Sequence, residues 1–149
     1  MKNLSRRSRF APLAVSLLLA LLATQTRAEM RQYGSFEVHY SVFASSFLQP
    51  DIAAAYGIVR AKDRALLNIA VRRGTGDAAT VSAVLSGTRG DLIRKTPLEF
   101  REIREDQAVY YIAEFGFVSG ETQYFDIAIQ PAGEARPLVL QFNHVLYAD

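Results

Sequence analysis

Short runs of alternating apolar and polar residues make up most of the chain after residue 28. The run 36–42, for example, places Phe36, Val38, Tyr40 and Val42 on one face and polar residues on the other. Alternation with a period of two is the pattern of a β-strand that buries one face. Seven such runs follow one another, separated by clusters of glycine, proline and aspartate. They lie near residues 36–42, 67–71, 80–86, 97–104, 107–115, 125–129 and 138–147.

This succession predicts an all-β fold, because no long helical period separates the runs. Seven strands at spacings near ten residues favour an antiparallel β-sandwich with an immunoglobulin-like arrangement. The chain contains no cysteine and no tryptophan. The marks of a true antibody domain are therefore missing, and a small barrel is the alternative topology.

The runs 97–104 and 107–115 flank the polar pair Glu105-Asp106, which predicts a tight hairpin. Phe100 and Ile103 differ in parity along the first of these runs. Either a bulge shifts its register, or both faces of this strand are covered.

The segment from Ala44 to Lys62 departs from the strand pattern and is too long for a hairpin. Within it, Pro50 begins a short alanine-containing stretch that ends at Gly57. Proline at the start and glycine just past the end predict a helix of one to two turns in the loop between the first two strands.

Residues 1–28 have the pattern of a secretory signal peptide. A basic start precedes an apolar run from Ala11 to Ala23, and small and polar residues follow up to Ala28. A membrane-spanning helix needs roughly 20 apolar residues, so this run is too short to be one. We expect cleavage near Ala28, export to the periplasm and a single soluble domain at 29–149 without a membrane span.

Removal of this leader changes the charge of the protein. It takes away five of the 17 Lys and Arg residues and none of the 15 Asp and Glu residues, so the net charge becomes −3. The sequence therefore offers no support for nucleic-acid binding. The absence of cysteine excludes disulfides and thiolate metal sites, and we expect no cofactor.

Several strings of residues together resemble one known family, the domain of unknown function 4426. The resemblance implies a single domain exported from Gram-negative bacteria, and it implies no catalytic residues. The pair Glu105-Asp106 departs from the glycine that the resemblance implies at this turn. The strings are Phe36-Glu37-Val38-His39-Tyr40, Phe47-Leu48-Gln49-Pro50, Ala55-Tyr56-Gly57-Ile58, Leu67-Asn68-Ile69, Phe100-Arg101-Glu102-Ile103-Arg104-Glu105 and Tyr110-Tyr111-Ile112-Ala113-Glu114-Phe115.

The chain has only two histidines, His39 and His144. With Glu37 they would form a metal site if the first and last strands were adjacent. His39 lies on the polar face of its strand, whereas His144 shares the face of its strand with leucines and a phenylalanine. We therefore expect two structural histidines and no metal.

Catalytic groups are sparse. The pair Ser45-Ser46 has no G-x-S-x-G context and no histidine nearby in sequence, so we interpret it as a turn. The hairpin carboxylates are interleaved with arginines, which favours ion pairs on a solvated face over a glycosidase pair. These carboxylates are Glu99, Glu102, Glu105, Asp106 and Glu114.

The insertion between the first two strands is the strongest candidate for a binding surface. Its Phe47, Leu48 and Tyr56 are apolar enough to meet a partner, and Arg60 and Arg64 offer positive charge for an anionic group. The structural alternative is that these apolar residues plug one open end of the sandwich.

Three functional hypotheses follow. The first is a non-catalytic binding or accessory module of the cell envelope, whose partner is another envelope protein or a small ligand. The second is a small periplasmic hydrolase that uses His39 or the hairpin carboxylates. The third is an envelope chaperone or assembly factor that donates an edge strand.

Overall fold

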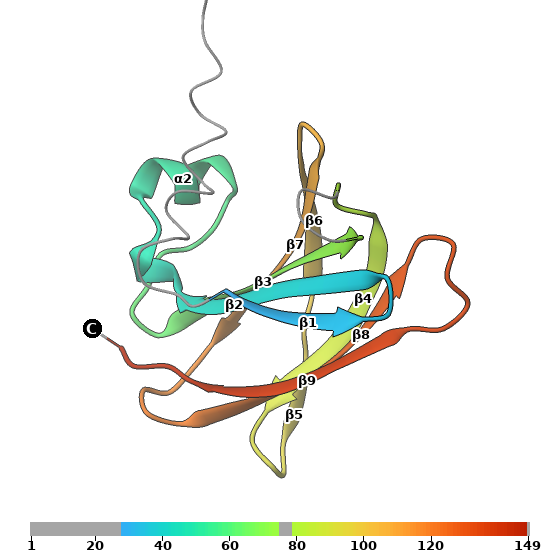
Figure 1. Ribbon diagram of the computed structural model, residues 1–149. Coiled ribbons are helices and arrows are strands. Elements are labelled where there is room, and N and C mark those ends of the chain that lie inside the picture. Colours follow the sequence, from blue (N-terminus) through green and yellow to red (C-terminus); the bar gives the residue numbers. More distant parts are fainter. Residues whose placement is uncertain (1–27, 75–78, 149) are drawn as a thin grey trace, which may run out of the picture.

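Two antiparallel β-sheets pack face to face in the computed structural model, which describes residues 28–74 and 79–148 (Figure 1). The predicted signal peptide, apart from Ala28, lies outside the described residues. No helix within the described ranges is long and apolar enough to cross a bilayer.

The first sheet has five strands in the order β1-β2-β3-β7-β6. The second has four strands in the order β5-β4-β8-β9. The strands of the first sheet are β1 (Glu29–Tyr33), β2 (Phe36–Ala44), β3 (Arg64–Arg73), β6 (Phe100–Glu105) and β7 (Ala108–Gly116). Those of the second are β4 (Ala83–Gly90), β5 (Lys95–Pro97), β8 (Thr122–Pro131) and β9 (Leu138–Val145).

This strand order is that of an immunoglobulin-like sandwich. The orders β2-β3-β7-β6 and β4-β8-β9 correspond to the ABED and CFG sheets of that fold. β1 adds an edge to one sheet and β5 to the other. The predicted fold class is therefore confirmed, and its Greek-key topology follows from the pairing.

All seven predicted strands are present, and the two additional strands, β1 and β5, are short edge strands. The prediction was wrong at Pro97, which ends β5 in the second sheet, whereas β6 begins at Phe100 in the first. It was also wrong to end a strand at Gly87, because β4 runs on to Gly90. A Cβ atom at Gly87 would lie 2.6 Å from the carbonyl oxygen of Asp126, so the glycine permits close packing of β4 on β8.

The main core lies between the two sheets and consists of the inward faces that the alternation predicts. Its fully buried members include Val38, Leu67, Ile69, Ile127 and Leu140. Aromatic rings close one side of the core: the ring centroids of Tyr40 and Phe142, and those of Phe125 and Phe142, lie 4.6 Å apart.

The predicted hairpin joins β6 to β7, with Glu105 paired to Ala108 across a two-residue turn. Asp106 occupies the left-handed region with φ +50°, a conformation that aspartate tolerates where glycine is more usual. The β6–β7 register is continuous, so no bulge is present. Both faces of β6 are covered instead: Phe100 packs on the main core, and Ile103 packs on a second apolar cluster.

The insertion between β2 and β3 contains a 3-10 turn, η1 (Ser45–Phe47), and the predicted helix, α2 (Pro50–Ala55). Pro50 lies in the first turn of α2, and Gly57 follows the helix with φ +63°, as the sequence predicts. Because the structure adds β1 before the first predicted strand, this helix lies between the second and third strands of the fold.

Candidate functional site

The insertion packs on the outer face of the five-stranded sheet and forms a second apolar cluster there. From the insertion come Leu48, Ala53 and Ile58, all buried. From the sheet come Phe43, Leu66 and Ile112, whose positions alternate with those of the main core. The insertion therefore covers a sheet face and does not plug an end of the sandwich.

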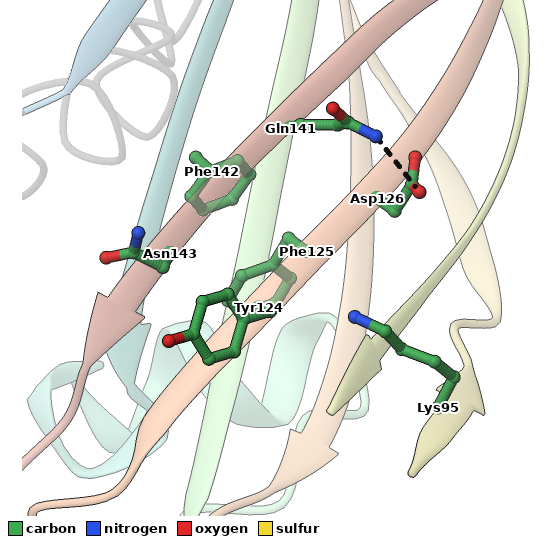
Figure 2. Close-up of a pocket in the computed structure, with 7 residues that line it drawn as sticks. All are labelled: Lys95, Tyr124, Phe125, Asp126, Gln141, Phe142 and Asn143. Carbon is green, nitrogen blue, oxygen red and sulfur yellow. Dashed lines mark hydrogen bonds between the residues drawn. The ribbon is translucent and has the colours of Figure 1, made fainter. Parts of the chain in front are cut away.

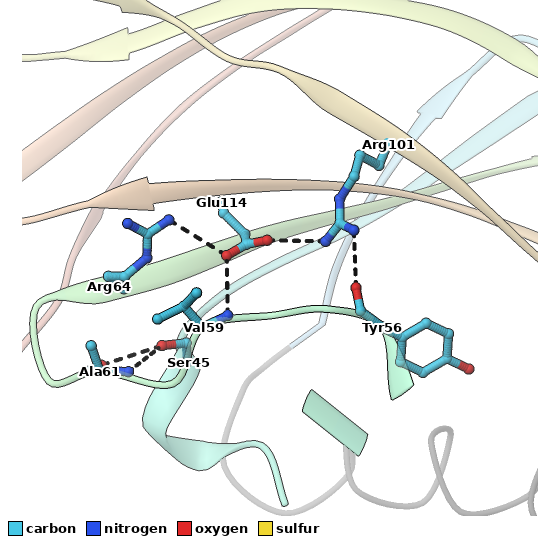
Figure 3. A network of polar contacts seen from close by, with 7 residues as sticks. All are labelled: Ser45, Tyr56, Val59, Ala61, Arg64, Arg101 and Glu114. Carbon is cyan, nitrogen blue, oxygen red and sulfur yellow. Dashed lines mark hydrogen bonds and ion pairs between the residues drawn. The ribbon is translucent and has the colours of Figure 1, made fainter. Parts of the chain in front are cut away.

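Polar contacts fasten the same segment to the sheet (Figure 3). Glu114 on β7 accepts a hydrogen bond from Arg101 at 3.0 Å, and its other carboxylate oxygen lies 3.5 Å from both the Val59 amide and the Arg64 guanidinium. Arg101 also donates to the backbone oxygen of Tyr56 at 2.9 Å. Glu114 thus joins two strands to the insertion.

A second set of bonds closes the base of the insertion. The Ser45 hydroxyl accepts from the Ala61 amide at 3.0 Å and donates to the Ala61 carbonyl at 3.2 Å. The Arg60 guanidinium donates to the carbonyl of Ser46 at 3.0 Å. The pair Ser45-Ser46 is therefore part of the backbone closure, in agreement with its interpretation as a turn.

The structure places four of the five predicted binding residues on the insertion and the fifth, Arg64, at the start of β3. Four of the five already have intramolecular partners. Leu48 is buried in the second cluster, Tyr56 packs against it, and Arg60 and Arg64 make the bonds described above. Phe47 differs, because its side chain remains half exposed.

The two histidines lie on different sheets, one facing outward and the other facing the core. His39 is on the outer face, where its Nε2 lies 3.1 Å from a carboxylate oxygen of Glu37. His144 is on the inner face of β9, where burial lowers its pKa and the charge of Glu29 partly opposes that shift. The described residues contain no group of three or more metal-ligating side chains.

The hairpin carboxylates form contacts with arginines and a tyrosine. Glu102 lies 2.5 Å from the guanidinium of Arg104 and accepts a hydrogen bond from Tyr111 at 3.0 Å, while Glu114 pairs with Arg101. The ion pairs that the interleaved charges predict are thus present on the hairpin.

The sheet edges are protected to different degrees. β6 carries four charged residues, Arg101, Glu102, Arg104 and Glu105, and charges on an edge strand discourage pairing with another chain. On β9, the Val139 carbonyl accepts a hydrogen bond from the Tyr33 hydroxyl at 2.8 Å, so side-chain contact occupies part of that edge. These features do not favour donation of an edge strand.

Sequence reasoning missed a hollow of about 320 Å³ on the outer face of the four-stranded sheet (Figure 2). Tyr124 and Asp126 project from β8, Gln141 and Asn143 project from β9, and Lys95 reaches the hollow from β5. Tyr124 pairs with Asn143, and Asp126 with Gln141, in the β8–β9 register. The sequence shows that each of the two strands has a polar face. Only the pairing of β8 with β9 brings the side chains of these faces together.

The groups around the hollow suit the binding of a polar ligand. Gln141 donates to Asp126 at 3.2 Å, and the ammonium of Lys95 lies 5.8 Å from the centre of the Tyr124 ring. Amide, carboxylate and ammonium groups thus surround one aromatic ring, and they supply both donors and acceptors.

The fold and this surface define an immunoglobulin-like β-sandwich with one covered and one open sheet face. The chain belongs to the family described as domain of unknown function DUF4426, whose model matches residues 30–149. No protein with a curated description is similar to it at a significant level.

Solved structures agree with this assignment. The crystal structure of a DUF4426 family protein from Pseudomonas aeruginosa is 36% identical, covers 82% of this chain and 96% of its own, and has a TM-score of 0.70. FetP of uropathogenic Escherichia coli, recombinantly expressed in the periplasm, has a TM-score of 0.58 at 11% identity and covers 83% of this chain and 96% of its own. A copper-bound variant of FetP gives the same TM-score at 12% identity, covering 83% and 97%. At this identity, FetP supports the fold alone.

Proposed function

We propose that this protein is an exported periplasmic binding module of the cell envelope, with no catalysis of its own. The observation that carries the proposal is the uncovered hollow on the four-stranded sheet. It combines aromatic side chains with a few polar groups in a concave surface on the sheet, and these are the elements of a small-molecule site.

The ligand that fits this chemistry is a neutral, hydroxyl-rich molecule, such as a saccharide of the envelope. Tyr124 supplies an aromatic surface for the apolar side of a sugar ring. Asp126 and Asn143 supply acceptors and donors for its hydroxyls, and Lys95 adds a further donor. A hollow of about 320 Å³ has room for one or two sugar rings.

We assign Leu48, Tyr56 and Arg60 of the insertion, together with Arg64 at the start of β3, to holding the insertion on the sheet. Phe47 is half exposed and remains a candidate contact for a partner. Replacing Phe47 with alanine, with the fold intact, should weaken binding of an envelope partner if the insertion takes part in recognition.

The ligand proposal is tested by NMR titration of the exported protein with soluble oligomers of N-acetylglucosamine. We expect shifts of amide signals on β8 and β9, and about tenfold weaker binding in the Asp126→Ala variant. Glu121→Ala, an exposed carboxylate outside the hollow, is the matched control. Equal binding by Asp126→Ala and wild type, or shifts confined to other strands, would refute this site.

The compartment is tested separately by cell fractionation. We expect the full chain in the periplasmic fraction and a chain lacking residues 1–28 in the cytoplasm. Cytoplasmic retention of the full chain would refute export, and it would leave the ligand measurement unaffected.

A hydrolase is the second candidate, and the Glu37–His39 pair favours it. Ser41 is the next residue on the same face of β2 and is buried, so an acid, a histidine and a serine follow one another on alternate positions. The test is ester hydrolysis by wild type and by His39→Ala. Activity above buffer in the wild type that is lost in the variant would establish an enzyme.

A further inference from the structure

The turn between β4 and β5 exposes two adjacent aliphatic side chains, Leu92 and Ile93. Their exposed fractions are 77% and 91%, the highest among the exposed large hydrophobic residues of the described chain. Single exposed hydrophobic residues are ordinary, whereas two neighbours on one protruding turn point to an interaction site.

The turn holds these side chains outward by its own backbone geometry. One carboxylate oxygen of Asp91 accepts hydrogen bonds from the amides of Ile93 and Arg94 at 2.7 and 2.5 Å. A Cβ atom at Gly90 would clash with the carbonyl oxygen of Arg94. Glycine at this position therefore allows β4 and β5 to approach each other closely at the turn. The two aliphatic side chains are therefore presented on an ordered turn.

The position of the turn leaves it accessible. In Figure 1 it forms the end of the molecule away from α2 and extends beyond the neighbouring strands. A flat surface can therefore reach it without meeting the rest of the sandwich.

The charges beside the turn are mostly positive. Arg94 and Lys95 follow the aliphatic pair directly, and both are exposed. The carboxylate of Asp91 faces the backbone amides of the turn, and these hydrogen bonds lower its pKa. Since the chain after residue 28 is acidic overall, any attraction to an anionic surface is local to this turn.

We propose that this turn attaches the protein reversibly to an anionic lipid membrane. Leu92 and Ile93 enter the boundary between headgroups and acyl chains, and Arg94 contacts the lipid phosphates. Apolar residues at the tip with cations behind them match the layered chemistry of such a membrane. This inference goes beyond the proposed function and does not depend on a ligand in the hollow.

The test is co-sedimentation of the exported protein with vesicles. One set contains phosphatidylcholine alone, and the other contains equal amounts of phosphatidylcholine and phosphatidylglycerol. We expect binding to the anionic vesicles, weaker binding to the neutral ones, and a further decrease when salt is raised.

Two variants and their controls separate the contributions. Leu92→Ser combined with Ile93→Ser should lower the partition coefficient at least tenfold, whereas Val59→Ser combined with Val118→Ser, two exposed aliphatics in other loops, should leave it unchanged. Arg94→Gln should lower it about fivefold, and the exposed Arg136→Gln should not.

Three results would overturn the proposal. They are the absence of wild-type binding to anionic vesicles, equal binding to neutral and anionic vesicles, and undiminished binding by the Leu92 and Ile93 double variant. The first of these would direct attention to an apolar pocket on a protein partner instead. Circular dichroism of each variant confirms that the fold is retained.

Discussion

The two outer faces of the sandwich differ in what covers them. The five-stranded sheet carries the insertion, with a second apolar cluster and the Glu114 network beneath it. Within residues 28–74 and 79–148, no such layer covers the four-stranded sheet, and its outward residues Asp126, Val139 and Gln141 are exposed. One face therefore contributes to the stability of the fold, and the other is available for recognition.

This difference changes the interpretation of the insertion. An apolar loop between strands suggests a binding surface when only the sequence is considered, because functional residues often lie on loops. Here Leu48 and Ile58 are buried against the sheet, and Ile52 and Tyr56 pack against the same cluster. The open face, by contrast, carries mainly polar side chains around the hollow, with Val84 and Val139 as exposed apolar residues.

The largest expected effect comes from a cavity beneath the insertion. Leu66→Ala removes a side chain that is 1% exposed in the second cluster, and it should lower the free energy of unfolding by about 3 kcal/mol. Val84→Ala on the open face, where the side chain is 73% exposed, is the control and should change it by less than about 0.5 kcal/mol. Urea denaturation measures the free energy of unfolding of both variants. Equal decreases in the two variants would show that the two sheet faces contribute equally to stability.

A smaller effect is expected from the polar contacts of the insertion. Glu114→Gln removes the charge shared by Arg64 and Arg101, and it should cost about 1 kcal/mol, since both arginines are partly exposed and solvent screens the pairs. The exposed Glu121→Gln is the control. Thermal melting at low and high salt tests this, and a wild type whose stability does not respond to salt would argue against an electrostatic role.

The third prediction concerns His144, which lies on the inner face of β9 and not on either outer face of the sandwich. Burial lowers the pKa of His144 in the folded protein, so the unfolded chain binds a proton more readily. His144 therefore contributes stability above about pH 6.5 that is lost as the pH falls through the unfolded pKa. His144→Gln should flatten the dependence of stability between about pH 7 and pH 5. An unchanged slope in urea titrations across this range would contradict the shift.

The smallest effect on stability is expected on the open face. Asp126→Asn keeps the size of an exposed side chain that accepts a hydrogen bond from Gln141, so the free energy of unfolding should change by less than about 0.5 kcal/mol. Calorimetry measures this change. A loss of several kcal/mol would mean that the hollow is part of the structural framework and not a free recognition surface.

Much of the fold was predictable because its signals are local. The alternation along 36–42 identified the buried face of β2, and Pro50 and Gly57 marked the two ends of the α2 segment. The unequal parity of Phe100 and Ile103 indicated that β6 has a bulge or two covered faces, and the structure shows the second. The edge strands β1 and β5 were missed because short exposed strands have little apolar alternation.

The candidate site could not be predicted in the same way. Asp126 and Gln141 are 15 residues apart and become neighbours only through the β8–β9 register. Lys95 joins them from a three-residue strand that pairs with β4. No local pattern brings these three residues together.

The sequence by itself determined the period of each strand, the face that each strand buries and the short helix, because backbone geometry and side-chain alternation act over a few residues. Only the tertiary structure decided which strands share a sheet and which outer face the insertion covers. Those outcomes depend on contacts between distant segments, such as Leu48 with the sheet and Arg101 with Glu114. The physical reason is that burial and pairing are properties of the packed layers, whereas periodicity is a property of the chain.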